Sequence, residues 1–159
     1  MFSKINYEGS VEIQYETVAK QLDALLEGET DQIANLSNAS ALLNQFLDNI
    51  NWVGFYLLKE DELVLGPFQG LPACVRIAIG RGVCGTAVSK KETIVVDDVH
   101  EFPGHIACDA ASNSEIVIPI MKEHEVIGVL DIDSPIKSRF SYEDQKGLEL
   151  FINTLTKHI

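Results

Sequence analysis

The chain has 159 residues, enough for one domain with its own core, and 46% of them are apolar against 23% charged. Twenty-four acidic residues oppose twelve basic ones, and the resulting net charge of −12 argues against nucleic acid or an anionic membrane as a partner. No apolar run is long enough to span a membrane, and residues 1–8 lack the apolar core of a signal peptide, so we expect a cytoplasmic protein without a membrane anchor.

Two amphipathic helices are predicted in the first third of the chain. The first can be capped by Ser10 and ended by Gly28, and its apolar stripe is Val11, Tyr15, Val18, Leu22 and Leu25. The second can be capped by Asp31, and its stripe is Ile33, Leu36, Leu43, Leu47 and Ile50. Such stripes can pack the helices as a pair or against a second subunit, and for this reason we expect a homodimer.

Strand patterns follow from residue 52 onward. Residues 52–58, 63–65, 75–79 and 93–96 are predicted strands, and residues 66–72, rich in glycine and proline, are a predicted loop. A short helix is expected after Gly80, Gly82 and Gly85. Residues 115–121 and 125–132 resemble a hairpin that turns near residues 123–124.

The last helix is predicted to start at Ser141, with Asp144 as its capping-box partner. Its buried stripe is Leu148, Phe151, Ile152 and Leu155. The order of helices, a mostly antiparallel sheet and a closing helix indicates one α+β domain over residues 1–159. We expect helices at about residues 10–50, the sheet and active-site loops at about 51–134, and the final helix at about 141–158. The irregular stretch 97–113 is long for a compact domain and is typical of a functional loop.

Carboxylates lie at unexpected places in the sheet. Strand alternation puts Asp131 and Asp133 on one face of a mostly apolar strand, and Glu115 opens the preceding strand. If that face lines a cavity, desolvation and mutual repulsion disfavour ionisation of these groups. The alternative is that the two aspartates mark only the end of the strand.

Three cysteines are present, and no pair forms a CxxC motif. An odd number in a reducing compartment argues against a structural disulfide framework, and buried apolar roles are the simplest alternative. Cys108 lies in the long loop, where a thiol is accessible, but the adjacent Asp109 disfavours its thiolate. Cys84 lies near a helix start, where the helix dipole favours a thiolate, so local electrostatics name Cys84 as the more reactive thiol.

Other chemistries receive weaker support. His105 and Cys108 are three residues apart and His100 is near, but a structural zinc site needs a second close pair of ligands. A cysteine–histidine hydrolase would need a third residue to orient the histidine, and none is identifiable. The stretch from Gly80 to Gly85 lacks the lysine of a phosphate-binding loop, so we expect its glycines to serve turns and close packing.

Eight stretches together resemble one family, the free methionine-(R)-sulfoxide reductases of the GAF-domain fold. They are NWVGFY at 51–56, LGPFQG at 65–70, AC at 73–74, GRGVCG at 80–85, DVH at 98–100, FPGHIACD at 102–109, SEIV at 114–117 and GVLDIDS at 128–134. The resemblance runs from about Asn51 to Phe140, and the three cysteines in these contexts are specific to the reductases rather than to GAF sensor domains in general.

The resemblance implies free L-methionine (R)-S-oxide as substrate, thioredoxin as reductant and no cofactor or metal. By the same resemblance, Cys108 is the nucleophile, and Cys74 and Cys84 are both candidates to resolve its oxidised state. Trp52 and Tyr56 would wall the methyl-sulfur end of the substrate, and Glu115, Asp131 and Asp133 would hold its polar groups.

These residues suit sulfoxide reduction chemically. The reaction needs a soft nucleophile at sulfur and a proton on oxygen, which a thiol and a carboxyl group of raised pKa supply. Buried carboxylates also pair with the ammonium group of a free amino acid, a group that a peptide-bound residue lacks. Backbone N–H groups or Arg81 are expected to hold the substrate carboxylate. The alternatives are a non-catalytic GAF module that binds a small ligand and a peroxide sensor.

Overall fold

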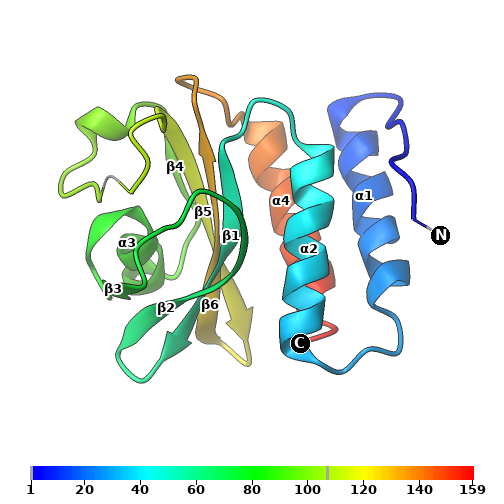
Figure 1. Cartoon of the computed structure of the whole chain (residues 1–159), viewed down its shortest axis with the longest axis horizontal. Coiled ribbons are helices and arrows are strands. Elements are labelled where there is room, and N and C mark those ends of the chain that lie inside the picture. Colours follow the sequence, from blue (N-terminus) through cyan, green and yellow to red (C-terminus); the bar gives the residue numbers. More distant parts are fainter. Residues whose placement is uncertain (1, 107) are drawn as a thin grey trace.

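The structure is a computed structural model that describes residues 2–106 and 108–159, so Ala107, part of the stretch 102–109, lies outside the described residues. A central sheet separates three long helices on one side from a shorter helix and several loops on the other (Figure 1). The elements are α1 (Val11–Leu26), α2 (Gln32–Phe46), β1 (Trp52–Lys59), β2 (Glu62–Gly70), β3 (Arg76–Ala78), α3 (Gly82–Lys90), β4 (Ile94–Val96), the 3₁₀ turn η1 (Val99–Glu101), β5 (Ser114–Lys122), β6 (Glu125–Ser134) and α4 (Tyr142–Leu155).

The six strands are hydrogen-bonded in the order β3-β2-β1-β6-β5-β4, and all paired neighbours are antiparallel. The predicted α+β class with a mostly antiparallel sheet is therefore confirmed. The β5–β6 hairpin turns at Glu123 and His124, both of which have positive φ, as the sequence predicts. Among the described residues, no helix is both long enough and apolar enough to cross a membrane.

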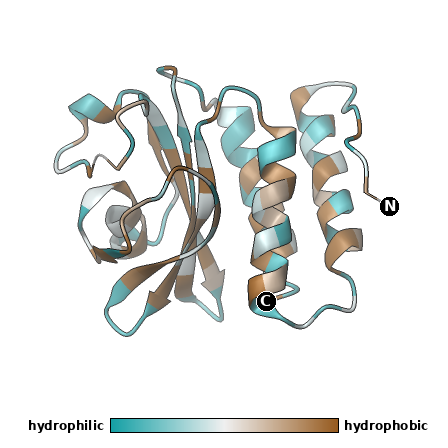
Figure 2. Cartoon of the chain, viewed as in Figure 1, coloured by the Kyte–Doolittle hydropathy of each residue, from teal (hydrophilic) through white to brown (hydrophobic). Residues whose placement is uncertain are grey.

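Alternate side chains of the central strands point to opposite faces of the sheet. Val53 and Phe55 of β1, with Leu130 and Ile132 of β6, are fully buried in the core formed with α1, α2 and α4. Figure 2 shows hydrophobic colour along the central strands and hydrophilic colour at the turns that join them. The other face holds a smaller apolar cluster around α3, and the candidate site lies beside it.

Two residues that the sequence predicts in the buried helix stripes are exposed. Val11 is 47% exposed and Ile33 is 60% exposed. Both lie in the first turn of their helices, and helical side chains lean toward the N-terminus, so a first-turn side chain extends past the helix end. The predicted caps are confirmed, because the Ser10 and Asp31 side chains accept hydrogen bonds from the N–H groups of Ile13 and Ala34.

The predicted loop over residues 66–72 is wrong in its first part, since β2 continues to Gly70. Gly54 of β1 pairs with Phe68 and Tyr56 pairs with Leu65, so Gly66 and Pro67 together oppose one residue of β1. This is a β-bulge, where a proline N–H is not needed for the ladder. The bulge places Phe68 next to Trp52, and their rings stack 5.1 Å apart.

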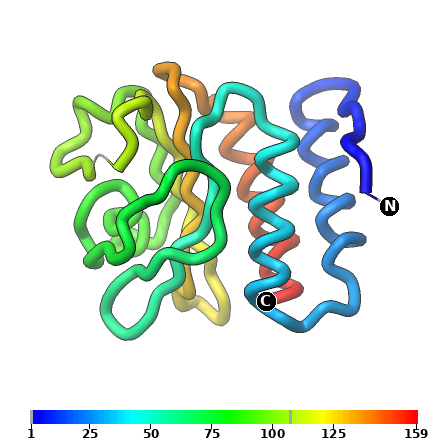
Figure 3. Tube along the Cα trace, viewed as in Figure 1, coloured from blue at the N-terminus to red at the C-terminus, as the bar shows by residue number. Residues whose placement is uncertain are grey.

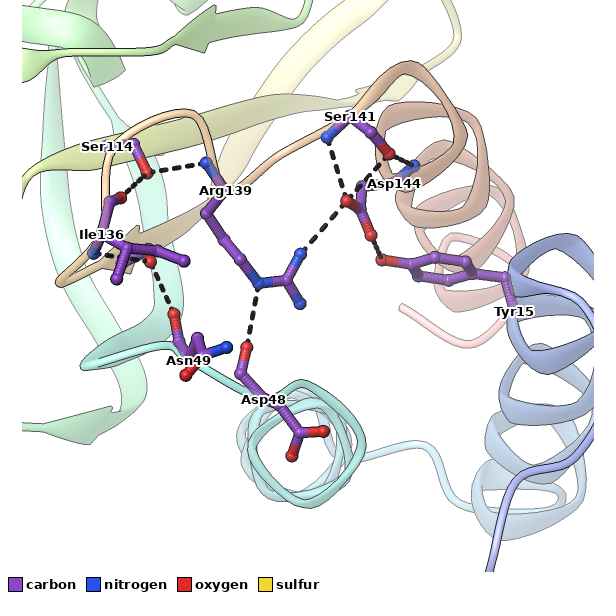
Figure 4. A network of polar contacts seen from close by, with 9 residues as sticks. Tyr15, Asp48, Asn49, Ser114, Ile136, Arg139, Ser141 and Asp144 are labelled. Atoms are coloured by element: carbon purple, nitrogen blue, oxygen red, sulfur yellow. Dashed lines mark hydrogen bonds and ion pairs between the residues drawn. The ribbon is translucent and has the colours of Figure 1, made fainter.

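A polar network ties α4 to α1 and to the strand ends that carry the carboxylates (Figure 4). Asp144 accepts hydrogen bonds from the Tyr15 hydroxyl at 2.7 Å and from Arg139 at 3.1 Å, and it forms the predicted capping box with Ser141. Arg139 also donates to the Asp48 carbonyl at 2.9 Å. These contacts fix the segment after β6, and Ser114 at the start of β5 is bound to the same segment.

Candidate active site

A pocket that is partly open to solvent lies on the α3 side of the sheet. Its walls come from β1, β5, β6, the start of α3 and the connections β2–β3 and β4–β5, which both lie on this side of the sheet (Figure 3). Of the eight residues that the resemblance assigns to the site, all but Cys74 line the pocket: Trp52, Tyr56, Cys84, Cys108, Glu115, Asp131 and Asp133. Arg81, expected near the substrate carboxylate, lines it too.

Strand register brings the three carboxylates together. Glu115 of β5 lies directly opposite Asp133 of β6, and Asp131 pairs with Gly54 of β1. Directly paired residues on antiparallel strands have their side chains on the same face. A Cβ on Gly54 would lie 2.2 Å from the Cβ of Phe68, so Phe68 packs directly on the Gly54 backbone, next to Asp131 in the sheet.

Burial dominates the electrostatics of the carboxylates. It raises the pKa of Glu115 to about 8, with a further contribution from the charge of Asp133. Burial and the charge of Glu115 raise the pKa of Asp131, and burial and the charge of Asp131 raise the pKa of Asp133. Asp131 Oδ1 is buried and has no hydrogen-bond donor among the described residues. The cluster therefore holds at least one proton near neutral pH, and Asp131 Oδ1 is an acceptor that no described donor uses.

Cys84 is a free, buried thiol on α3. The expectation of a favoured thiolate is wrong, because burial and the charges of Asp131 and Glu115 raise the pKa of Cys84 well above its ordinary value. The Cys84 sulfur and one oxygen each of Glu115 and Asp131 lie within 4.8 Å of one another. Among the described residues, these three are the ones placed closely enough to share a metal ion.

His105 closes one side of the carboxylate cluster. Its Nε2 lies 3.6 Å from a carboxylate oxygen of Glu115. Burial lowers the pKa of the imidazole despite the nearby charge of Asp131, so the neutral ring is favoured near pH 7. The zinc alternative at His105 and Cys108, which the ligand spacing already disfavours, gains no support, since the possible metal ligands found among the described residues include neither of the two.

Trp52 and Tyr56, which form an aromatic wall of the pocket, also hold the β2–β3 connection. The rings of Trp52 and Tyr56 lie 6.0 Å apart and nearly parallel. The Trp52 Nε1–H donates to the Leu71 carbonyl at 3.1 Å, and the Tyr56 hydroxyl donates to the Cys74 carbonyl at 2.8 Å. Burial and nearby carboxylates raise the pKa of Tyr56, so its hydroxyl stays protonated and remains a donor.

Cys74 and Cys108 form a disulfide, with their Cα atoms 6.2 Å apart. Cys74 lies between β2 and β3 and is partly exposed, whereas Cys108 lies between η1 and β5 and is exposed. The bond therefore joins the two connections at the mouth of the pocket, within reach of an external thiol. Cys84, the other predicted resolving thiol, is not part of this bond.

Asn51 is a site residue whose role the sequence patterns did not reveal. Its Nδ2 donates to Asp109 at 2.9 Å and to Ser112 at 3.1 Å, and its Oδ1 is buried without a described donor. Asp109 also accepts from the Ala111 N–H, so it binds the Cys108 loop to the start of β1. No periodicity marks such a contact, because the partners are far apart in the chain and lie outside regular elements.

The start of α3 forms the remaining wall. Gly82 and Val83 line the pocket, and Arg81 is the N-cap but makes no capping hydrogen bond. The predicted close-packing and turn roles of the glycines are confirmed: Gly82 has a φ of +61°, and a Cβ on Gly85 would lie 2.4 Å from the Ala78 carbonyl oxygen. Free N–H groups at a helix start suit a carboxylate ligand.

Comparisons with known proteins agree with this geometry. The GAF domain model matches residues 21–159. The Escherichia coli (strain K12) free methionine-R-sulfoxide reductase is 56% identical over 143 residues, which cover 90% of this chain and 87% of that protein. The structure of free methionine-R-sulfoxide reductase from Neisseria meningitidis in complex with its substrate has a TM-score of 0.93 at 42% identity and covers 99% of this chain and 95% of that one. The structure of the reduced form of fRMsr of Staphylococcus aureus has a TM-score of 0.88 at 60% identity, and the match covers 91% of this chain and 94% of that one.

Proposed function

The chain belongs to the GAF-domain family and, within it, to the free methionine-R-sulfoxide reductases, and we propose that Cys108 reduces free L-methionine (R)-S-oxide to L-methionine. One observation carries this proposal: a disulfide-forming cysteine and three buried carboxyl groups line or border one pocket walled by Trp52 and Tyr56. The pocket thus combines a sulfur nucleophile, a proton source and an apolar wall, which together are what sulfoxide reduction requires.

The first step transfers oxygen from substrate to enzyme. The Cys108 thiol attacks the sulfoxide sulfur, and a carboxyl group donates a proton to the sulfoxide oxygen. Glu115 is the proposed donor, because a pKa of about 8 leaves it protonated near neutral pH. The oxygen ends on the cysteine as a sulfenic acid, methionine leaves as the thioether, and the thiol proton restores the carboxyl group.

The second step resolves the sulfenic acid. The Cys74 thiol attacks the Cys108 sulfur, water leaves, and the disulfide forms. We favour Cys74 over Cys84 as the resolving thiol because Cys74 is the cysteine bonded to Cys108, while Cys84 is buried beside the carboxylates. A thioredoxin-type dithiol then reduces the exposed disulfide to two thiols and leaves as its own disulfide. Recycling of this kind fits a reducing compartment, so we place the protein in the cytoplasm.

Recognition of the free amino acid follows from the charges of the pocket. The substrate ammonium group pairs with Asp131 or Asp133, one of which ionises when the cation binds, while Glu115 keeps its proton. The substrate carboxylate is held by the N–H groups at the start of α3, with Arg81 nearby. A peptide-bound methionine sulfoxide offers neither charge, so it would leave these groups without partners.

The decisive experiment measures methionine formed from each free sulfoxide epimer with thioredoxin, its reductase and NADPH. The wild-type protein should consume the R epimer and leave the S epimer, and Cys108→Ser should form no methionine. Tyr142→Phe is the control for effects of expression and purification of a variant, because the Tyr142 side chain is exposed on α4 and lies outside the pocket. Appreciable turnover by Cys108→Ser, or equal use of the two epimers, would contradict the proposal.

Subunit assembly is a separate part of the proposal. We retain the homodimer as a prediction, although most residues of the apolar stripes that suggested it are buried in the core of the subunit itself. Sedimentation equilibrium at micromolar concentration tests it directly, and a monomer mass throughout would exclude it.

A further inference from the structure

The connection between β2 and β3, residues 71–75, is held by the disulfide at Cys74, by Ala73, which packs against the smaller apolar cluster, and by hydrogen bonds to its backbone. Its two ends, Leu71 and Val75, are each 60% exposed, so their side chains contribute little packing. Three hydrogen bonds anchor its backbone: Trp52 Nε1–H to the Leu71 carbonyl, the Tyr56 hydroxyl to the Cys74 carbonyl, and the Leu65 N–H to the Val75 carbonyl. Two of the three donors are therefore the aromatic side chains that form the wall of the pocket.

The contact of Tyr56 falls on Cys74 itself. The donor–acceptor distance of 2.8 Å is that of a well-formed O–H···O hydrogen bond. Tyr56 lies in the middle of β1, a central strand paired on both sides, so the sheet constrains the backbone that carries its hydroxyl. Cys74 in turn lies in a segment with no regular structure.

We propose that Tyr56 is a positioning residue for recycling: its hydroxyl holds the backbone of Cys74 so that the Cys74 sulfur lies within reach of Cys108. This inference rests on the proposed function, and it adds a second task to a residue of the substrate wall. The step it assists is the condensation of the Cys74 thiol with the Cys108 sulfenic acid, which forms the disulfide and releases water. Without the anchor, residues 71–75 sample more conformations, and fewer of them bring the two sulfurs together.

The test measures the stability of the Cys74–Cys108 disulfide rather than catalysis. Purified wild-type protein and Tyr56→Phe are equilibrated with mixtures of reduced and oxidised glutathione, quenched with acid and alkylated, and the Cys74–Cys108 disulfide is quantified by peptide mass. In this equilibrium two glutathione thiols reduce the protein disulfide and form one glutathione disulfide. Loss of one hydrogen bond should lower the equilibrium constant for disulfide formation about fivefold and make the potential about 20 mV more positive.

Tyr15→Phe is the matched control, because Tyr15 also donates one buried hydrogen bond but does so to Asp144 on the far side of the sheet. It should lower stability to denaturant and leave the disulfide potential unchanged. If Tyr56→Phe does not fold, Trp52→Phe removes the neighbouring anchor at Leu71 and should shift the potential in the same direction.

A potential for Tyr56→Phe equal to that of the wild type would overturn the inference, and so would the same shift in Tyr15→Phe, which would mean a general effect of destabilisation. No sulfoxide substrate enters this measurement. Failure of the methionine assay would therefore refute the proposed function separately from the positioning role.

Discussion

Replacement of Glu115 by glutamine should flatten the pH dependence of stability. Glu115 is only 5% exposed, so solvent screens its interactions little, and its pKa is raised from the ordinary 4.5 to about 8. Between these two values the folded protein binds a proton that the unfolded chain does not, so stability falls as pH rises through this window. From about pH 6 to about pH 8 the loss from this one group is about 2 kcal/mol, at about 1.4 kcal/mol per unit with half-titration at the upper end.

The assay is urea unfolding of the oxidised protein at about pH 6 and about pH 8, for the wild type and Glu115→Gln. The wild type should lose about 2 kcal/mol more than the variant between the two conditions. Asp131 and Asp133 remain in the variant, so its stability should still fall, but less steeply. Parallel losses in the two proteins would show that Glu115 does not hold a proton in the folded state, and the proposed acid role would lose its basis.

Two further substitutions test other parts of the site. Cys74→Ser should form about one methionine per chain and then stop, because the sulfenic acid has no partner thiol; sustained turnover with thioredoxin would show that another thiol resolves it. Gly54→Ala should lower the free energy of unfolding by about 1–3 kcal/mol, because the added Cβ overlaps Phe68 and Trp52. An unchanged urea midpoint for this variant would show that the bulged strand adapts at little cost.

Local sequence patterns predicted helices and turns correctly where residues close together in the chain determine the structure. The helix caps at Ser10, Asp31 and Ser141 and the turn at residues 123–124 depend on neighbours within a few residues, and all are confirmed. Strand β2 past Gly66 depends instead on pairing with β1 and on a bulge opposite Phe55. Rules based on local sequence predict a loop at Gly66 and Pro67, and these residues belong to a strand only because β2 pairs with β1.

The candidate site divides in the same way. Alternation along β6 placed Asp131 and Asp133 on one face, and the structure puts both in the pocket, but the register that sets Glu115 opposite Asp133 is a property of the assembled sheet. Cys84 shows most clearly where prediction from the sequence fails. The helix start that should favour its thiolate is present at Gly82, yet burial raises the pKa of Cys84 instead, and so do acidic neighbours on strands distant in sequence.

The carboxylates lie on central strands of the sheet, whereas the disulfide lies on connecting segments, and this difference fits the functions proposed for them. The proton transfer and charge pairing proposed for the carboxylates depend on fixed distances, and these residues lie on central strands, where both neighbouring strands constrain the backbone. In the proposed reaction Cys108 meets the substrate and then Cys74, and an external dithiol then reduces their disulfide, which requires movement and exposure. Both cysteines lie on connections at the pocket mouth. Tyr56 links the two parts, since its ring belongs to the rigid wall and its hydroxyl reaches the backbone of Cys74. A change at this one side chain should therefore affect recycling through the disulfide even where the carboxylates keep their places.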